Sequence, residues 1–303
     1  MPEGHVIHRL ADEFTRIFGT QRLHITSPQG RFATEAALVD GSRLERAEAF
    51  GKHLFLHFDA ASDEHIIYIH LGLIGHLRFE DREKVWGQIR LRIEALADDS
   101  ASDSGTKTRS SSAAENNSAT EGSSDSRNSH HLAANLRGPQ WCRLITDEEY
   151  AIAVGKIGED PIRDDADPKQ VWTKVQRSKR SIGSLLMDQK LFAGVGNIYR
   201  AEVLFRHQQS PFTPGNAIDR SVFFAMWEDL VALMRQGVVD GEINTVRDEH
   251  TPEVMHRPAR DDEHGGEVYV YRRAGDDCYV CGSDIAMKAY EGRNLFWCPT
   301  CQA

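Results

Sequence analysis

Four of the five cysteines form two close pairs near the end of the chain, Cys278-x-x-Cys281 and Cys298-x-x-Cys301, with 16 residues between them. Two short turns that each present two thiolates are typical of a four-cysteine zinc site. Two disulfides or unrelated cysteines are the alternatives, but the paired spacing and the absence of a secretory signal favour zinc. Since a four-cysteine site leaves no open position, we expect one structural Zn²⁺.

The sequence between the two cysteine pairs, residues 290–297, predicts a hairpin with Arg293 near its tip. An arginine in this position is well placed to bind a phosphate with two parallel hydrogen bonds. An ordinary solvated arginine is the alternative. Cys142, the fifth cysteine, lies in a strand-like stretch and is expected to be an inert core thiol.

The first residues can supply an amine nucleophile. Pro2 follows the initiator methionine, which is usually removed before a small residue, and would then present a secondary amine. Attack of that amine on a sugar C1′ gives an iminium ion, which has no N–H to lose and stays an electron sink. Glu3 could shuttle protons, and Lys52 could serve as a second proton donor. A Pro-Glu start alone does not establish this chemistry, because very many proteins begin this way.

A glycine-rich turn precedes a predicted helix that begins at Asn197. Gly194 and Gly196 allow a ligand's backbone to approach closely, and helix starts bind anions through free backbone amides. Residues 169–210 carry eight basic and two acidic side chains, a local charge of +6 in a chain of net charge -10. This excess of positive charge is typical of a surface that binds the phosphate backbone of a nucleic acid. An ordinary helical hairpin with a solvated charged face is the alternative, and the charge count alone does not decide between them.

The elements that must position these residues change character along the chain. Residues 3–18 have helical spacing, whereas the segments after them alternate as half-buried strands: 23–26, 53–58, 65–71, 77–79, 88–96 and 140–146. Helices are predicted after Tyr150, over 170–175, 181–187, 197–207 and 221–236. We expect an α+β protein with an antiparallel β-sandwich or barrel over 1–149, a helical domain over 150–265 and a zinc module over 266–303.

The composition sets limits on the class of protein. A chain of 303 residues with 40% apolar residues can build about two globular domains. Residues 98–131 contain 11 serines in 34 positions and no Leu, Ile, Val or aromatic residue, so we expect a disordered insertion there. No apolar run is long enough to span a membrane, and no signal peptide is visible. We therefore expect an intracellular, cytoplasmic protein.

Taken together, the motifs resemble one family. Their order along the chain is similar to that in the Fpg/Nei superfamily of DNA glycosylases, and closest to the endonuclease VIII branch. The matching segments are Met1–His5, Gly51–Lys52, His70–Leu73, Gly194–Tyr199 and Gly292–Gln302. The resemblance covers the chain outside residues 98–131. It implies a β-sandwich, a helix-two-turns-helix domain and a zinc finger that together clamp damaged duplex DNA, and we expect a monomer.

The resemblance also implies a reaction. Pro2 would be the Schiff-base nucleophile, Glu3 the general acid at the sugar ring oxygen, and Lys52 a phosphate contact that assists elimination. Arg293 would hold a phosphate and take part in δ-elimination. The implied enzyme is a bifunctional DNA glycosylase and AP lyase of base excision repair, which removes oxidised bases, pyrimidines favoured, by β,δ-elimination.

Further residues are assigned to DNA binding on the same basis. His70 and Asn197 would contact phosphates, and Leu73 would fill the gap left by the extruded base. Arg137 is a guess for a DNA contact, because the usual partners of the wedge fall near the insertion. Val6 stands where the family usually has a glutamate, so a proton relay through that position is absent.

Two alternative functions stay open. An enzyme of the same fold could prefer 8-oxoguanine and formamidopyrimidines, and residues 240–264 give no specificity signal that decides between them. A catalytically silent lesion-binding protein could use the same clamp, although the joint presence of Pro2, Glu3 and Lys52 argues against it.

Overall fold

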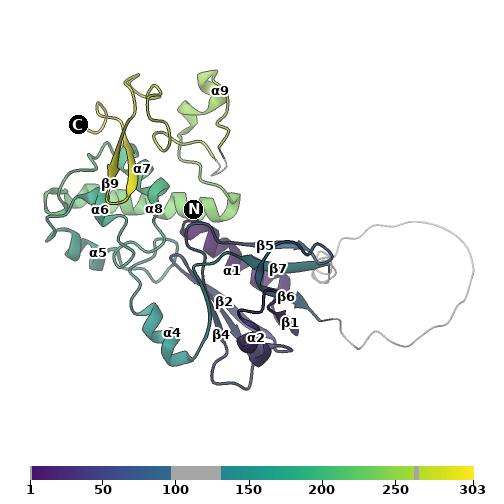
Figure 1. Ribbon diagram of the computed structural model, residues 1–303. Coiled ribbons are helices and arrows are strands. Elements are labelled where there is room, and N and C mark those ends of the chain that lie inside the picture. Colours follow the sequence, from purple (N-terminus) through teal and green to yellow (C-terminus); the bar gives the residue numbers. More distant parts are fainter. Residues whose placement is uncertain (1, 97–130, 263–265) are drawn as a thin grey trace, which may run out of the picture.

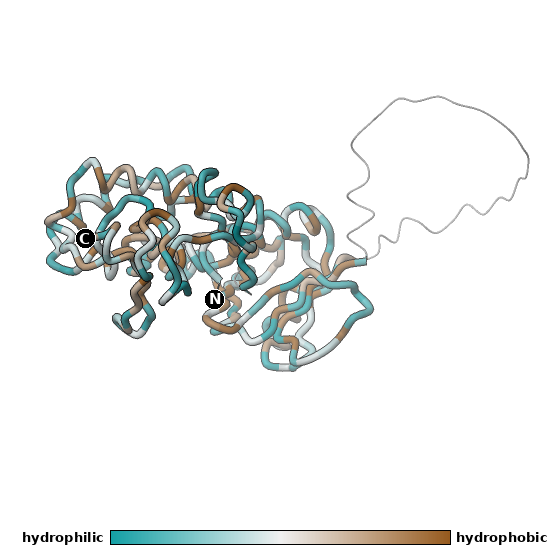
Figure 2. The backbone as a smooth tube through the Cα atoms, turned by 90° about the horizontal axis from the view of Figure 1, so that it is seen from above, coloured by the Kyte–Doolittle hydropathy of each residue, from teal (hydrophilic) through white to brown (hydrophobic). Residues whose placement is uncertain are grey.

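The chain folds into two lobes of mixed α and β structure (Figure 1). The computed structural model describes residues 2–96, 131–262 and 266–303. Each lobe has its own hydrophobic core, one formed by the antiparallel sheets and the other by the helices together with the C-terminal segment. Viewed from above, the lobes lie next to each other and the N-terminal end of the chain lies where they meet (Figure 2). The α+β prediction is confirmed.

The first lobe is built from two four-stranded antiparallel sheets, with strand orders β1-β6-β7-β5 and β2-β3-β4-β8. Their inward side chains alternate with outward ones, and the inward ones form the core between the sheets. The strands are β1 (Leu23–Thr26), β2 (Leu44–Phe50), β3 (His53–Phe58), β4 (Ile66–His70), β5 (His76–Asp81), β6 (Ile89–Ala95), β7 (Leu132–Arg137) and β8 (Trp141–Ile145).

Helix α1 (Gly4–Phe18) connects the two lobes. Its apolar face, which includes Ile7, Leu10 and Phe14, is buried in the core of the first lobe. The helix also packs against β2, β3 and the long helix α8 (Arg220–Asp240) of the second lobe. The helix stops at Gly19, as the sequence predicts. This packing fixes the start of α1, and with it Pro2 and Glu3, at the junction of the lobes.

The second lobe combines the predicted helices with the C-terminal hairpin. Apolar residues of the hairpin and two cysteines, Cys278 and Cys298, belong to the same core as the helices. The buried carboxylate of Glu202 accepts hydrogen bonds from the amides of Tyr269, Val270 and Tyr271, which joins α7 to the C-terminal segment. The elements are α5 (Pro168–Val175), α6 (Ile182–Leu185), α7 (Asn197–Arg206), α8 (Arg220–Asp240), α9 (Pro252–Met255), β9 (Ala286–Tyr290) and β10 (Arg293–Trp297).

Five of the described helices and strands were absent from the sequence prediction: α2 (Ala33–Val39), β2, β7, α4 (Asp147–Val154) and α9. The helix α2 is short, so its periodicity is weak, and the charged residues of β2 obscure its alternation. The helical region begins at Asp147 rather than after Tyr150, and α4 packs on the outer face of the β2-β3-β4-β8 sheet. The predicted disordered insertion, 98–131, lies outside the described residues except for His131. The strands on either side, β6 and β7, are antiparallel neighbours.

Candidate active site

A pocket of about 360 Å³ lies at the junction of the two lobes, where α1 begins. It brings together five of the residues singled out in the sequence: Pro2, Lys52, His70, Leu73 and Arg293. These residues come from the start of α1, the β2–β3 turn, the end of β4 and the tip of the β9–β10 hairpin. The fold therefore assembles one site from four separate parts of the sequence.

Close contacts between glycines allow this convergence. Gly51, in the β2–β3 turn, has a positive φ of 58°, and a Cβ atom there would lie 2.7 Å from the backbone nitrogen of Gly194. A Cβ atom on Gly4 would lie 2.8 Å from the Cα of Gly194, and the amide of Gly4 donates to the carbonyl of Gly194 at 2.8 Å. Larger residues would separate Lys52 and Pro2 from the second lobe.

Glu3 is buried, and its carboxylate lies at the N-terminus of α7. It accepts hydrogen bonds from the amides of Gly196 at 3.0 Å, Ile198 at 2.8 Å and Tyr199 at 3.4 Å. The prediction that these amides are free to bind an external anion is therefore wrong, because the protein's own carboxylate occupies them. Burial raises the pKa of Glu3, while Lys52 and the three amides oppose that rise. A carboxyl with a raised pKa is suited to donate a proton.

Lys52 lines the pocket, and both its side chain and the turn that carries it are held by hydrogen bonds. Its Nζ donates to the carbonyl of Val195 at 3.0 Å, and burial lowers the pKa of its ammonium group, with nearby Arg293 acting in the same direction and Glu3 against it. The turn that carries Lys52 is fixed by Asp160, whose carboxylate accepts from the amide of Gly51 at 2.6 Å and contacts His8 Nε2 at 2.7 Å. No local pattern in the sequence predicts these two contacts of Asp160, because its partners are distant in the chain.

Asn197 and the hairpin tip are tied together by a buried arginine. The side chain of Arg200 donates to Asn197 Oδ1 and, at 3.4 Å, to the carbonyl of Asn294, which also accepts from Asn197 Nδ2 at 3.0 Å. Burial lowers the pKa of Arg200 to about 10. Asn197 is itself mostly buried, so its predicted contact with phosphate stays a prediction. Arg293 follows the turn at the tip of the hairpin, as the sequence predicts.

Some of the eight basic residues in 169–210 are buried or form ion pairs, so the predicted basic surface carries less free positive charge than the count suggests. Arg200 is 1% exposed, and Arg206 forms an ion pair with Asp229 at 2.7 Å. Arg180 is exposed but pairs with Asp188 at 2.8 Å. Lys169, Lys174, Arg177, Lys179 and Lys190 are the other exposed basic residues of this segment.

The loop between β4 and β5 presents two apolar side chains to solvent. Leu73 is 60% exposed and Ile74 is 84% exposed, although only Leu73 lines the pocket. The loop begins at His70, whose ring stacks on Trp141 at 4.5 Å and whose Nδ1 accepts from the amide of Gly72 at 3.1 Å. Burial lowers the pKa of His70, so its ring is neutral near pH 7. Ile74 was not singled out in the sequence.

Arg137 lies away from the pocket and is buried. Its guanidinium group covers the ring of Trp86 at 4.1 Å and forms an ion pair with Glu80 at 2.8 Å. The Trp86 indole N–H donates to the same carboxylate at 3.2 Å. The DNA contact of Arg137 stays a prediction, and the exposed part of this cluster is the ring of Trp86.

Gln189 and Gln140 also line the pocket and were missed in the sequence. Gln189 accepts from the amide of Gly194 at 3.1 Å and donates to the carbonyl of Val195 at 2.8 Å, the same carbonyl that Lys52 binds. It therefore fixes the turn that carries both predicted glycines. Gln189 ends a segment, residues 182–189, that is similar to the endonuclease VIII branch, but no role was predicted for either glutamine from the sequence.

Gly196 offers a direct test of this packing. A Cβ atom at this position would lie 2.3 Å from Glu3 Cδ, although the backbone angles are accessible to any residue. We expect Gly196→Ala to lower the free energy of unfolding by about 1–3 kcal/mol, measured by urea denaturation, because Glu3 must move. The control is Gly155→Ala, at a helical φ of -62°, for which we expect a change within about 0.5 kcal/mol. An equal effect of the two substitutions would contradict the packing argument.

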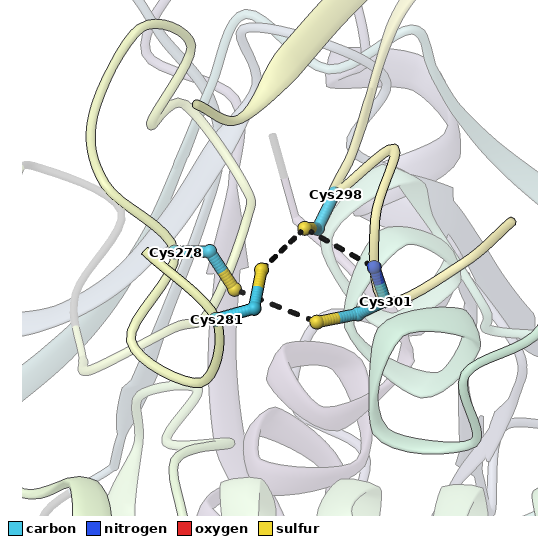
Figure 3. A group of neighbouring side chains, drawn as sticks. All are labelled: Cys278, Cys281, Cys298 and Cys301. Atoms are coloured by element: carbon cyan, nitrogen blue, oxygen red, sulfur yellow. Dashed lines mark hydrogen bonds between the residues drawn. The ribbon is translucent and has the colours of Figure 1, made fainter. Parts of the chain in front are cut away.

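The four cysteines of the C-terminal segment converge as predicted (Figure 3). Their sulfur atoms all lie within 4.8 Å of one another, with Cys281 and Cys298 Sγ at 3.4 Å and Cys278 and Cys301 Sγ at 3.9 Å. A tetrahedral ion with bonds of about 2.3 Å to sulfur separates its ligands by about 3.8 Å, so the donor set fits such an ion. Cys142 is buried in the first core, and burial raises the pKa of its thiol.

Two family models match the chain over most of its length. The formamidopyrimidine-DNA glycosylase N-terminal domain matches residues 1–109, and the formamidopyrimidine-DNA glycosylase H2TH domain matches residues 157–248. Endonuclease 8 1 of Mycobacterium tuberculosis (strain ATCC 25618 / H37Rv) is 40% identical over 309 residues, which cover all of both chains. The chain therefore belongs to the Fpg/Nei family, the DNA glycosylases of base excision repair.

Further similarities are more distant. A formamidopyrimidine-DNA glycosylase of Prochlorococcus marinus (strain MIT 9312) is 31% identical over 149 residues, 49% of each chain. The Lactococcus lactis formamidopyrimidine-DNA glycosylase, in a structure bound non-covalently to DNA containing an AP site, has the same fold, with a TM-score of 0.70 and 19% identity over 99% of each chain. Within the described residues, no helix has the length and hydrophobicity that crossing a membrane requires.

Proposed function

We propose that this protein is a bifunctional DNA glycosylase and AP lyase that excises oxidised bases, with pyrimidines favoured, from duplex DNA. The observation that carries the proposal is the shared pocket of Pro2, Lys52 and Arg293, with the carboxyl of Glu3 buried next to it. An amine nucleophile, a carboxyl with a raised pKa and two cations are the groups that this chemistry needs. The 40% identity to a protein named Endonuclease 8 1 supports the same class.

The first stage of the proposed reaction replaces the damaged base by the protein. The Pro2 nitrogen, freed by removal of Met1, attacks C1′, and the base leaves with the electron pair of the C1′–base bond and takes up the proton that the Pro2 nitrogen loses. Glu3 donates a proton to the sugar ring oxygen, which opens the ring and leaves an iminium ion between Pro2 and C1′. The raised pKa of Glu3 keeps its proton available closer to neutral pH than that of an exposed glutamate.

The second stage cleaves the strand. The iminium ion acidifies the C2′ proton, and its loss expels the 3′ phosphate by β-elimination. A second elimination expels the 5′ phosphate and leaves a gap of one nucleotide. Lys52 and Arg293 supply the positive charge that binds these phosphates, and the lowered pKa of Lys52 makes its ammonium group a better proton donor.

A borohydride trap tests the proposal. Incubation of the protein with duplex DNA that carries thymine glycol, in the presence of sodium borohydride, should reduce the iminium ion to a stable amine. Mass spectrometry of the digested adduct should place the DNA fragment on Pro2. Parallel reactions with dihydrouracil and 8-oxoguanine should give more adduct with the pyrimidine lesions. A linkage on any other residue, or none with all three substrates, would refute the mechanism.

Leu73 is proposed to fill the gap that the extruded base leaves in the duplex. We expect Leu73→Ala to weaken binding to a duplex with a tetrahydrofuran abasic analogue about tenfold, because an inserted side chain recovers part of the unstacking cost. Ile74→Ala is the matched control, since Ile74 is more exposed but does not line the pocket. Fluorescence anisotropy with labelled duplex measures both, and a larger loss for Ile74→Ala would reassign the wedge.

The four cysteines are proposed to bind one structural Zn²⁺ through Cys278, Cys281, Cys298 and Cys301. Such an ion would hold together the base of the β9–β10 hairpin and so fix the position of Arg293 at its tip. Its contribution is to folding rather than to bond cleavage, because four thiolates leave no open coordination position.

Metal content tests this assignment. Cys298→Ser should remove zinc from about one ion per chain to near zero in inductively coupled plasma mass spectrometry, and should lower the free energy of unfolding by several kcal/mol. Cys142→Ser is the control, because Cys142 lies in the other lobe and should keep the full zinc content. Full zinc retention in Cys298→Ser would contradict the four-cysteine site.

A further inference from the structure

A second and larger cavity adjoins the active-site pocket. It has a volume of about 610 Å³ and lies between the outer face of the β2-β3-β4-β8 sheet, helix α4 and residues 189–190. Gln189 lines both cavities, and His53, which lines the second one, lies 4.9 Å from the ring of His70 in the first. Nothing in the proposed reaction uses this space.

One side of this cavity is aromatic and held in place. Trp141 is fixed by its stacking on His70, and Tyr68 stacks on the buried Phe55 at 4.5 Å. The Tyr68 hydroxyl is 2.7 Å from His53 Nδ1, so this ring is also anchored at its polar end. Pre-positioned aromatic side chains bind planar rings at little cost in conformational entropy.

Three cations line the same cavity, and one of them, Arg143, lies beside the aromatic rings, with its guanidinium 5.6 Å from the centre of the Trp141 ring. Arg143, Lys156 and Lys190 line the cavity and are exposed, so their charged groups can reach a ligand at its mouth. The carboxylate of Glu149, which also lines it, accepts a hydrogen bond from the amide of Thr146 at 3.1 Å as part of a capping box at the start of α4. The cavity thus combines an apolar aromatic interior with an excess of positive charge.

We propose that this cavity binds a nucleotide, with the base against the aromatic side and the phosphate between Arg143, Lys156 and Lys190. Its volume falls within the range of about 300–1,000 Å³ that is usual for small-molecule sites. Base–aromatic contact and charge-assisted hydrogen bonds to phosphate are the interactions by which proteins bind such ligands. The proposal does not depend on the glycosylase reaction. The nucleotide is either a free monophosphate or one residue of a bound DNA strand.

Equilibrium dialysis with tritiated deoxythymidine 5′-monophosphate tests the proposal on the full chain. We expect saturable binding of one molecule, and a loss of affinity of at least about tenfold in Ile152→Trp, which fills the cavity from α4. Leu38→Trp is the matched control, because Leu38 lies on α2, away from the cavity, and is 47% exposed against 49% for Ile152. Arg143→Gln should weaken the monophosphate about tenfold but leave binding of thymidine, which lacks the phosphate, nearly unchanged.

Competition identifies the source of the nucleotide. If the monophosphate competes with a tetrahydrofuran duplex for the protein, the site holds a residue of the DNA strand. If both bind together, the site holds a free nucleotide. The proposal is overturned if no saturable binding occurs up to about 10 mM monophosphate, a concentration above that of any useful site, or if Ile152→Trp binds it as well as Leu38→Trp.

Discussion

Replacing Pro2 by leucine should abolish the borohydride-trapped adduct and lower strand cleavage at abasic sites on the order of 10³-fold or more, as expected for loss of a covalent nucleophile. Leucine is too large for efficient removal of Met1, so the amine would lie one residue further from the pocket. The close contact of Gly4 with Gly194 prevents a shift of α1 that could bring the amine back into the pocket. Denaturing gel electrophoresis of labelled duplex measures both adduct and cleavage.

Pro2→Gly separates the role of the amine from the role of the proline ring. Glycine permits removal of Met1 and leaves a primary amine in nearly the same place, so we expect a weak but detectable adduct. Its iminium ion can lose the N–H proton and become a neutral imine, which is a poorer electron sink than the permanent cation formed by proline. Intact mass measurement of each variant establishes whether Met1 is present. A strong adduct in Pro2→Leu with Met1 retained would disprove the assignment of the nucleophile.

The parts of the fold that the sequence predicted well are those with strong local patterns. Helix α1 has a long amphipathic repeat that ends at a glycine, and the two cysteine pairs specify their own geometry. Helix α2 and strand β2 were missed, because seven residues are too few to establish a period and charged residues interrupt the alternation of β2. Tertiary packing decides whether such short helices and strands form.

The sequence predicted several residues of the candidate site, but not the contacts that position them. Pro2, Lys52 and Arg293 were singled out, and the structure places them in one pocket. The contact of Glu3 with the amides of α7 joins residues that are 193 or more positions apart, and no local pattern can indicate it. Charge counting likewise treated Arg200 as a surface cation, whereas burial gives it a structural role. Sequence patterns name chemical groups, and packing determines which of those groups reach solvent.

Replacing Glu3 by glutamine should separate the two stages of the proposed reaction. We expect excision of thymine glycol to fall about 10²–10⁴-fold, the usual contribution of a general acid, because the amide cannot donate a proton to the ring oxygen. Cleavage of a preformed abasic site, whose hemiacetal ring opens to the aldehyde without help from the protein, should fall by less than about tenfold, since the reaction then does not depend on a proton from Glu3 to open the ring. Single-turnover assays on the two substrates give the comparison, and equal losses would contradict the role of Glu3 as the acid.

The pH dependence gives an independent test of the same residue. Burial raises the pKa of Glu3, so the protonated acid persists above its usual value near 4.5 and is lost as the pH rises through the raised pKa. Excision by the wild-type protein should therefore decrease with rising pH on this limb, whereas the residual excision by Glu3→Gln should lack the limb. Lys52 provides a second check. Its positive charge opposes the rise in the pKa of Glu3, so Lys52→Met should raise that pKa further and move the limb to higher pH. If the limb stays in place in Glu3→Gln, another group titrates there, and the proton donor must be sought elsewhere in the pocket.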